Sequence, residues 1–290
     1  MKIAHVVDSM EVGGAETLVA QMCRLQRELG HDPQVYAIAN LGALGKKMQA
    51  EGFRVEANIG SHLADSSLGF LRLFRGFRPD VVHLHNPTPT IYAAPAARLA
   101  SVSSVISTRH SLVGPPRNQT MERKYAMAAR FCDWVVGICD ATVNNVKDAG
   151  SAPPKKILRI YNGTVAVNAE SEDRWPAKSG FTLLFVGRLE EVKNLPFLLT
   201  ALRDAIAENP GIQLWIVGDG TQRGHLEQLS QELGLSSNVT FWGQQLDVAR
   251  FFSAADVFVM SSVSEGLPMS LLQSFSIGLP AIVTDVGGMA

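Results

Sequence analysis

Short runs of Val, Ile and Leu alternate with longer segments of helical period, and this alternation limits the possible folds more than any other feature of the chain. The runs 2–7, 181–186 and 212–217 are each followed directly by Asp or Gly. Apolar runs bounded in this way are typical of strands buried on both faces of a parallel sheet. Their alternation with amphipathic helices predicts a doubly wound α/β fold.

The strand–helix units fall into two series. In the first, the predicted strands are 2–7, 33–39, 53–58, 81–85, 104–107, 134–138 and 157–160, and the predicted helices are 15–29, 66–76, 119–131 and 141–148. In the second, strands 181–186, 212–217, 239–242, 256–260 and 280–284 alternate with helices 194–208, 222–233, 246–253 and 268–277. The polar, aperiodic segment 168–173 separates the two series and puts a boundary within 165–178. We expect two Rossmann-like domains, 1–167 and 168–290, that face each other across a cleft and bind ligands at the carboxyl ends of their strands.

The given sequence stops at Gly287-Gly288-Met289-Ala290, directly after the predicted strand 280–284 and without a closing helix. The second series is also shorter than the first. We therefore expect a truncated carboxyl end and an incomplete second domain, and we expect the given chain to be poorly active by itself.

Composition excludes several classes of protein. Charged residues make up 18% of the chain and the formal net charge is −1, so a nucleic-acid partner has no electrostatic support. The three cysteines, Cys23, Cys132 and Cys139, form no C-x-x-C pair and indicate a reducing compartment. The strand-like start reaches Asp8 early, and no apolar run is long enough to span a bilayer. These features predict a cytoplasmic protein without a signal peptide.

The segment Glu265-Gly266-Leu267-Pro268 predicts an anion site beside a carboxylate. Pro268 suits the first turn of a helix, where its missing N–H costs nothing. The free amides of Met269, Ser270 and Leu271 would then point back toward Glu265, at the positive end of the helix dipole. A phosphate site next to a carboxylate fits a ligand with both phosphates and hydroxyls, such as a nucleotide sugar.

Two cations follow the predicted strand 181–186. Arg188 and Lys193 on one post-strand loop could clamp a diphosphate from two sides, the first as a planar fork and the second as a point charge. The alternative is a solvated basic turn beside Glu190 and Glu191. The position of the loop after a strand favours the diphosphate.

Two glycine-rich turns also follow strands. Gly13 and Gly14 open the first helix, where they let a ligand approach the backbone or serve a loop that needs positive φ. Gly218-Asp219-Gly220 would need a small residue at position 223 to form a dinucleotide fingerprint, and the chain has Arg223. We interpret this second turn as structural.

Histidines end two strands of the first series. His83 and His85 lie on one face of their strand because side chains alternate, but no third metal ligand occurs at a characteristic spacing. We expect them to line the cleft or to hydrogen-bond in a partly buried site. His110 follows strand 104–107, where it is a candidate for contacting a reacting group, with packing as the alternative.

The chain contains no Asp-x-Asp, the acidic pair that would hold a divalent metal against a diphosphate. If a nucleotide sugar is the donor, Arg, Lys and helix amides must then meet the negative charge of its leaving diphosphate. We predict no metal and no cofactor.

Residues 70–78 mix apolar and basic side chains. Such a helix could contact the inner face of an anionic membrane. The alternative is a helix that packs on the core while its arginines extend into solvent.

The chain as a whole resembles a retaining glycosyltransferase of family 4, with the GT-B fold. The motifs that carry the resemblance are Gly13-Gly14-Ala15-Glu16, His83-Leu84-His85, Thr108-Arg109-His110, Tyr161-Asn162-Gly163, Gly187-Arg188-Leu189 with Lys193-Asn194, Gly218-Asp219-Gly220, Phe241-Trp242-Gly243, Glu265-Gly266-Leu267-Pro268 and Thr284-Asp285-Val286-Gly287-Gly288.

The resemblance implies transfer of a sugar from a nucleotide donor to a glycan or lipid-linked acceptor, with retention and without a metal. It also implies the donor contacts. Arg188, Lys193 and Gly14 would meet the diphosphate, amides 269–271 the phosphate, Glu265 the sugar hydroxyls, backbone near Gln245 the base, and His110 would lie near the anomeric centre.

One position departs from the family pattern. The second glutamate, expected eight residues after Glu265 and implied to contact ribose hydroxyls, is Gln273. A glutamine amide still accepts from a hydroxyl but loses the charge-assisted bond, so donor affinity is expected to be lower. A non-catalytic nucleotide-sugar-binding protein, an inactive fragment and a GT-B sugar epimerase remain alternatives.

Overall fold

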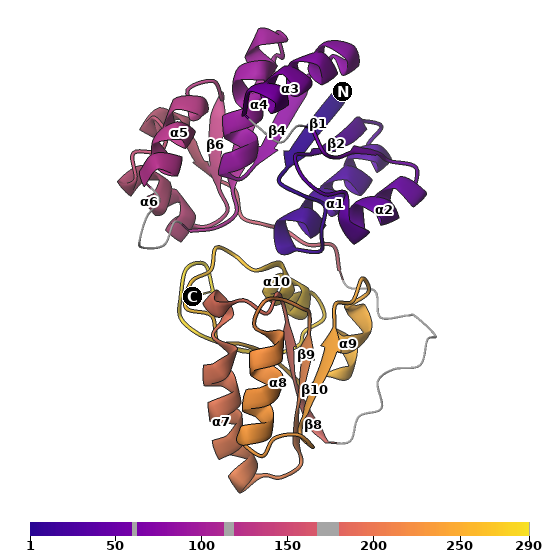
Figure 1. Ribbon diagram of the computed structural model, residues 1–290, viewed down its shortest axis with the longest axis vertical. Helices are drawn as coiled ribbons and strands as arrows, with labels where there is room; N and C mark the ends of the chain where they lie inside the picture. Colours follow the sequence, from indigo (N-terminus) through magenta and orange to yellow (C-terminus); the bar gives the residue numbers. More distant parts are fainter. Residues whose placement is uncertain (60–62, 113–118, 167–179, 290) are drawn as a thin grey trace. The chain divides into compact units, whose positions relative to one another are not determined.

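The computed structural model describes residues 1–59, 63–112, 119–166 and 180–289. Contacts within the chain divide it into two units, Met1–Asn162 and Gly163–Ala290 (Figure 1). The boundary predicted within 165–178 lies almost entirely outside the described residues, and it stays a prediction.

The first unit is built on a seven-stranded parallel sheet of order β3-β2-β1-β4-β5-β6-β7. Its strands are β1 Lys2–Val7, β2 Asp32–Ala37, β3 Arg54–Glu56, β4 Val81–His85, β5 Ser104–Arg109, β6 Trp134–Gly137 and β7 Ile157–Arg159. The described helices are α1 Gly14–Glu28, α2 Gly42–Ala50, α3 Leu63–Phe77, α4 Pro87–Leu99, α5 Gln119–Ala129 and α6 Asp140–Asp148.

Helices cover both faces of this sheet, because successive side chains of each strand point to opposite faces. Val6 of β1 packs in a core with Phe74 of α3, whereas Val7 packs in a second core with Cys23 of α1 and Met48 of α2. Parallel strands buried on both sides read as continuous apolar runs, which is the pattern that predicted the fold.

The second unit repeats the arrangement around a five-stranded parallel sheet of order β10-β9-β8-β11-β12. Phe185 packs with α7 and α8 on one face, and its neighbour Leu184 packs with α9 and α10 on the other. The elements are β8 Phe181–Val186, α7 Leu195–Glu208, β9 Ile212–Val217, α8 Arg223–Glu232, β10 Val239–Gly243, α9 Ala249–Ala254, β11 Val257–Met260, α10 Met269–Ser276 and β12 Ala281–Val283.

Each predicted strand is present, with ends within two residues of those expected. Two helices were not predicted, α2 and α4. The segment of α4, Pro87-Thr88-Pro89-Thr90 and onward to Pro95, contains three prolines that argue against a helix. Proline at the first helical positions is tolerated, and burial of Ala93 and Ala97 stabilises the rest through tight packing.

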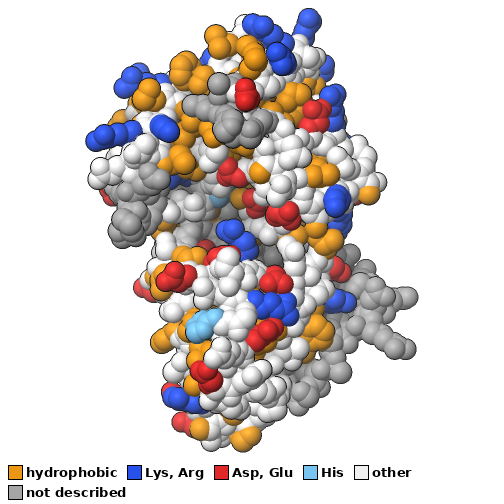
Figure 2. All heavy atoms as spheres, viewed as in Figure 1, with side chains coloured by type: hydrophobic (Ala, Val, Ile, Leu, Met, Phe, Trp, Pro, Cys, Tyr) orange, Lys and Arg blue, Asp and Glu red, His pale blue; other side chains and the backbone are white. Residues whose placement is uncertain are grey.

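The helix over residues 70–78 packs on the core. Phe70, Phe74 and Phe77 of α3 are buried, and Arg72 and Arg75 are exposed. The phenylalanines of this helix therefore pack in the interior, as the packing alternative predicts. On the face drawn in Figure 2, basic side chains are interspersed with acidic and apolar ones. Among the described residues, no helix is both long enough and apolar enough to cross a membrane.

Candidate functional site

In the second unit, two loops at the carboxyl end of the sheet are hydrogen-bonded to each other. The loop after β8 contains a 3-10 turn over Glu191–Lys193, and the loop after β11 runs beside it. The Val263 N–H donates to the Val192 carbonyl at 2.9 Å, and the Ser261 hydroxyl lies 3.0 Å from the Lys193 carbonyl. These bonds fix the two loops to one another without any ligand.

The contact brings together two residues predicted for the site from positions 72 apart in the chain. Lys193 Nζ lies 2.5 Å from Glu265 Oε1, and the two side chains are 15% and 12% exposed. Lys193 therefore does not form a solvated turn with its sequence neighbours. An ammonium has two further donors, and a partly shielded pair binds other charges more strongly than an exposed one.

A third loop, after β12, packs against the same place. The Gly288 N–H donates to the Gly266 carbonyl at 2.7 Å. Gly287 has φ +64°, and a Cβ there would lie 1.7 Å from the Glu265 carbonyl oxygen. The backbone can approach Glu265 this closely only because position 287 is glycine.

Arg188 lies on the same loop as Lys193, but its side chain is exposed. Its guanidinium makes no hydrogen bond or ion pair within the described part of the chain. The structure thus brings Lys193 and Glu265 into contact and leaves the guanidinium of Arg188 free to meet a ligand.

The helix predicted after Pro268 begins at Met269, with Pro268 as its N-cap. Leu272 donates to the Pro268 carbonyl at 3.3 Å and is the first residue to close a helical turn. The amides of Met269, Ser270 and Leu271 therefore lack acceptors within the helix, which is the arrangement that attracts an anion. Only Pro268 separates these residues from Glu265, Gly266 and Leu267.

Two glutamines predicted to meet the nucleotide differ in their surroundings. Gln245, after β10, donates from Nε2 to the Trp242 carbonyl at 2.9 Å and accepts from Arg250 at 2.9 Å. Its side chain is engaged locally, so only its backbone suits the predicted contact with a base. Gln273 on α10 is half-buried, and its side chain has no hydrogen-bond partner among residues whose positions are described.

The turn Gly218-Asp219-Gly220 has the structural role predicted for it. Gly218 has φ +141°, and a Cβ there would lie 1.9 Å from the Gly187 carbonyl oxygen. The Leu189 N–H donates to the Asp219 carbonyl at 2.9 Å. The turn therefore positions the loop that carries Arg188.

A pocket with a volume of about 420 Å³ opens where α7 and α8 begin. Carboxylates of Glu190 and Glu191 in its wall would repel a diphosphate. It is lined by Glu190, Glu191, Asn194, Leu195, Pro196, Gln222, His225 and Leu226.

In the first unit, Gly13 is the N-cap of α1 with φ −157°, and Gly14 is exposed. The alternative that this loop needs positive φ is wrong. A Cβ at Gly13 would lie 2.2 Å from Glu16 Oε2, the far end of a flexible side chain that can move aside. Approach of a ligand to Gly14 stays a prediction.

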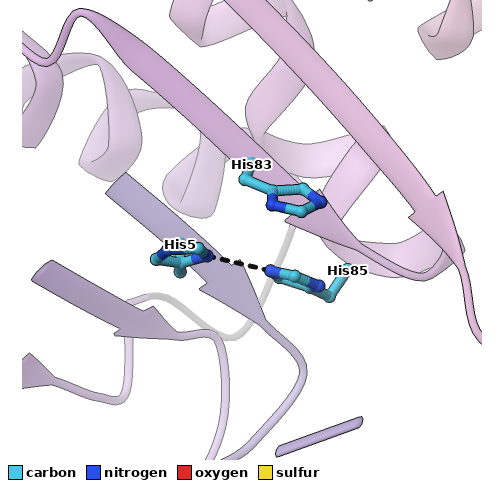
Figure 3. A group of neighbouring side chains, drawn as sticks. All are labelled: His5, His83 and His85. Atoms are coloured by element: carbon cyan, nitrogen blue, oxygen red, sulfur yellow. Dashed lines mark hydrogen bonds between the residues drawn. The ribbon is translucent and has the colours of Figure 1, made fainter. Parts of the chain in front are cut away.

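Three imidazoles meet on the α1 face of the first sheet (Figure 3). His5 pairs in register with His83 because β1 and β4 are neighbours. His5 Nδ1 lies 3.1 Å from His85 Nε2, and His83 Nε2 lies 2.8 Å from the Thr108 hydroxyl. The expectation of hydrogen bonding for His83 and His85 is confirmed. The sequence reasoning missed His5, since nothing in its spacing shows that β1 lies beside β4.

His110 joins this group after β5. Its ring Nε2 lies 3.0 Å from His85 Nδ1, and its backbone N–H donates to Asn86 Oδ1 at 3.0 Å. Asn86 adopts φ +77°, an uncommon backbone conformation that often marks a functional site. Asn86 was also missed, although its place directly after β4 could have indicated it.

The imidazoles are neutral near pH 7. Burial lowers the pKa of His5 to about 4 and that of His110 to about 4. Burial also lowers the pKa of His83 and His85 well below the usual value, with the neighbouring imidazoles adding to the effect. The group can therefore exchange hydrogen bonds but carries no charge to attract a phosphate.

Each of the two units matches a family of known proteins. Residues 12–165 match the family described as Glycosyltransferase Family 4, and residues 180–290 match Glycosyl transferases group 1. The crystal structure of Anabaena Alr3699/HepE in complex with UDP and glucose superposes with a TM-score of 0.85 at 22% identity, covering 99% of this chain and 82% of that chain. The fold is therefore that of GT-B glycosyltransferases, with two parallel α/β domains as predicted.

Two curated relatives show closer sequence similarity over part of their length. The lipopolysaccharide core biosynthesis glycosyltransferase LpsE of Rhizobium meliloti is 35% identical over 55% of this chain and 46% of that protein. The Escherichia coli UDP-Gal:alpha-D-GlcNAc-diphosphoundecaprenol alpha-1,3-galactosyltransferase is 28% identical over 77% of this chain and 62% of that protein. The matched part of the chain thus spans less than two thirds of either relative. The chain belongs to glycosyltransferase family 4.

Proposed function

We propose that this protein transfers a sugar from a nucleotide-sugar donor to a glycan or lipid-linked acceptor, with retention of anomeric configuration and without a metal. The observation that carries the proposal is the contact between Lys193 and Glu265 at the start of α10. A cation, a carboxylate and free helix amides in one place match the phosphates and hydroxyls of such a donor.

Each predicted residue has a role in this proposal. In the second unit, Arg188 and Lys193 would hold the diphosphate together with the amides of Met269, Ser270 and Leu271. Glu265, with the adjoining Gly266 and Leu267, would bind the donor sugar, Gln273 the ribose and the backbone at Gln245 the base. In the first unit, Gly13 and Gly14 would contact the donor, and His110 would lie near its anomeric centre.

The relatives favour a particular donor and acceptor class. HepE was crystallised with UDP and glucose, which supports a uridine nucleotide as the donor carrier. The Escherichia coli relative acts on a diphosphoundecaprenol-linked sugar, which supports a lipid-linked acceptor. Since Arg72 and Arg75 are exposed while the phenylalanines of α3 are buried, membrane contact by this unit would be electrostatic and restricted to anionic lipid.

A donor panel tests the function. Nucleotide sugars that raise the Tm are incubated with lipid-linked and oligosaccharide acceptors, and release of the nucleoside diphosphate is followed with and without EDTA. We expect acceptor-dependent release that EDTA leaves unchanged, and an NMR coupling constant that shows retention in the product. Inversion, or full inhibition by EDTA, would contradict that part of the proposal.

The rival that Gln273 favours is a nucleotide-sugar-binding protein without turnover. Calorimetry with nucleoside diphosphates separates the two, because the rival predicts binding with no product from any acceptor. An epimerase would instead convert the donor sugar when no acceptor is present.

A further inference from the structure

Four side chains of the first unit form an unbroken line of hydrogen bonds. Gln26 Oε1 on α1 lies 2.9 Å from His5 Nε2, and His5 Nδ1 lies 3.1 Å from His85 Nε2. His85 Nδ1 then lies 3.0 Å from His110 Nε2. Each of the three rings stacks or tilts against its neighbour, with centroids of His85 and His110 5.2 Å apart. The line uses both ring nitrogens of His5 and His85.

A neutral imidazole has one N–H donor and one lone-pair acceptor. All hydrogen bonds along the line must therefore run from donor to acceptor in the same direction. If the carbonyl oxygen of Gln26 faces His5, then His5 must donate from Nε2. His85 must in turn donate from Nε2 to His5, and His110 from Nε2 to His85. His110 Nδ1 is then left with a lone pair.

That last nitrogen is unusual. His110 Nδ1 is buried and has no hydrogen-bond partner in the described parts of the chain. A buried acceptor without a partner costs free energy unless a ligand supplies the donor. It is therefore the end of the line at which a ligand group would be accepted.

A metal site is the competing interpretation. Ring nitrogens of His5, His83 and His85 lie within 4.8 Å of one another. However, both ring nitrogens of His5 and both ring nitrogens of His85 already form hydrogen bonds, to Gln26, to His110 or to each other. The His83 ring also lies over the His85 ring, with centroids 4.1 Å apart (Figure 3), whereas metal ligands point their ring-plane lone pairs to one centre. The hydrogen bonds favour the line over the metal.

We propose that Gln26, His5 and His85 are positioning residues that fix His110 as the Nε2–H tautomer, so that His110 Nδ1 accepts a hydrogen bond from a hydroxyl of the bound ligand. The identity of that ligand as a sugar-containing donor rests on the proposed function. The direction of the line does not, because it is a property of the ligand-free first unit.

The direct test is ¹⁵N NMR of the full chain labelled at its seven histidines, with single His→Gln variants for assignment. A protonated ring nitrogen resonates far upfield of an unprotonated one. We expect His5, His85 and His110 each to carry the proton on Nε2 in the ligand-free protein near pH 7. Nδ1–H tautomers, charged imidazoles or stoichiometric zinc in the purified protein would overturn the proposal.

Gln26→Leu removes the group that sets the direction, and Gln21→Leu makes the same change elsewhere on α1. We expect Gln26→Leu to introduce the Nδ1–H tautomer at His110 and to lower kcat/KM for the donor roughly fivefold, the effect of about one hydrogen bond. Gln21→Leu should do neither. An unchanged His110 spectrum in folded Gln26→Leu would remove Gln26 from this role.

The ligand contact has its own readout. The nucleotide sugar with the largest Tm increase should move the His110 Nδ1 resonance upfield, and the matching nucleoside diphosphate should not. Equal shifts with both would contradict a sugar hydroxyl as the partner. If no nucleotide sugar binds, the proposed function fails while the ligand-free spectrum still decides the direction of the line.

Discussion

The two candidate binding regions differ in the kind of side chain they contain, charged in the second unit and neutral in the first. In the second unit, Lys193 and Glu265 form an ion pair, and their side chains are 15% and 12% exposed. In the first, His5 and His85 are 0% and 1% exposed, and burial keeps them neutral. The first pair can recognise charge, whereas the second can recognise only the direction of a hydrogen bond.

The largest effect is expected from removing a cation at the charged region. Lys193→Ala should lower kcat/KM by several hundredfold, and Arg188→Ala by roughly a hundredfold or more, because each would meet developing charge on the leaving diphosphate. Steady-state kinetics with the natural donor measures both. Arg203→Ala removes an equally basic, exposed side chain from α7 and should leave kcat/KM near that of the wild type. Near-normal kinetics of Lys193→Ala would show that the charged region does not bind the diphosphate.

The backbone that supports the charged region gives the next effect. Gly218→Ala puts a Cβ 1.9 Å from the Gly187 carbonyl at φ +141°, and we expect it to destabilise the protein by on the order of 3 kcal/mol. Gly224→Ala is the control, since a Cβ there meets open space. Urea unfolding measures both variants. Equal urea midpoints for the two variants would mean that the turn at Gly218 does not pack against the Gly187 carbonyl as closely as described.

The neutral region predicts a loss of stability in acid. The pKa of His5 is about 4 when folded, below its usual 6.5, so the unfolded chain binds more protons between these values. The contribution of neutral His5 to the free energy of unfolding is fully present above about pH 6.5 and is lost as the pH drops toward 4. For His5 alone, the free energy of unfolding falls by about 2 kcal/mol from pH 7 to pH 5. Urea midpoints across this range measure the slope, and His5→Gln should reduce it. A flat profile would show that the imidazoles are not sealed from water.

The smallest effect concerns Gln273. Gln273→Glu should tighten nucleoside diphosphate binding about threefold, because a carboxylate makes a charge-assisted bond to a ribose hydroxyl. Gln231→Glu introduces the same charge on α8 and should leave the affinity unchanged. Weaker binding of Gln273→Glu would place residue 273 nearer the phosphates than the ribose.

The sequence predicted the fold more completely than the site. Buried parallel strands have apolar runs that are visible locally, so β8 and β9 were predicted at their observed bounds. Helix α4 was missed because its prolines outweigh its alanines in any local assessment, and only burial reverses the balance. Lys193 and Glu265 were predicted from loop chemistry, and the structure brings them into contact because β8 and β11 are neighbours in the sheet. His5 and Gln26 could not be predicted, because their roles depend on the pairing of β1 with β4 and on the packing of α1.

The central claim is that the loops around Lys193 hold a diphosphate, and calorimetric titration tests it most directly. UDP, GDP and ADP, each with its monophosphate, are titrated into the wild-type chain and into Lys193→Ala. We predict that one diphosphate binds clearly more tightly than its monophosphate, and that Lys193→Ala reduces this difference roughly tenfold or more. Equal binding of diphosphate and monophosphate, or the same difference in the variant, would contradict the account.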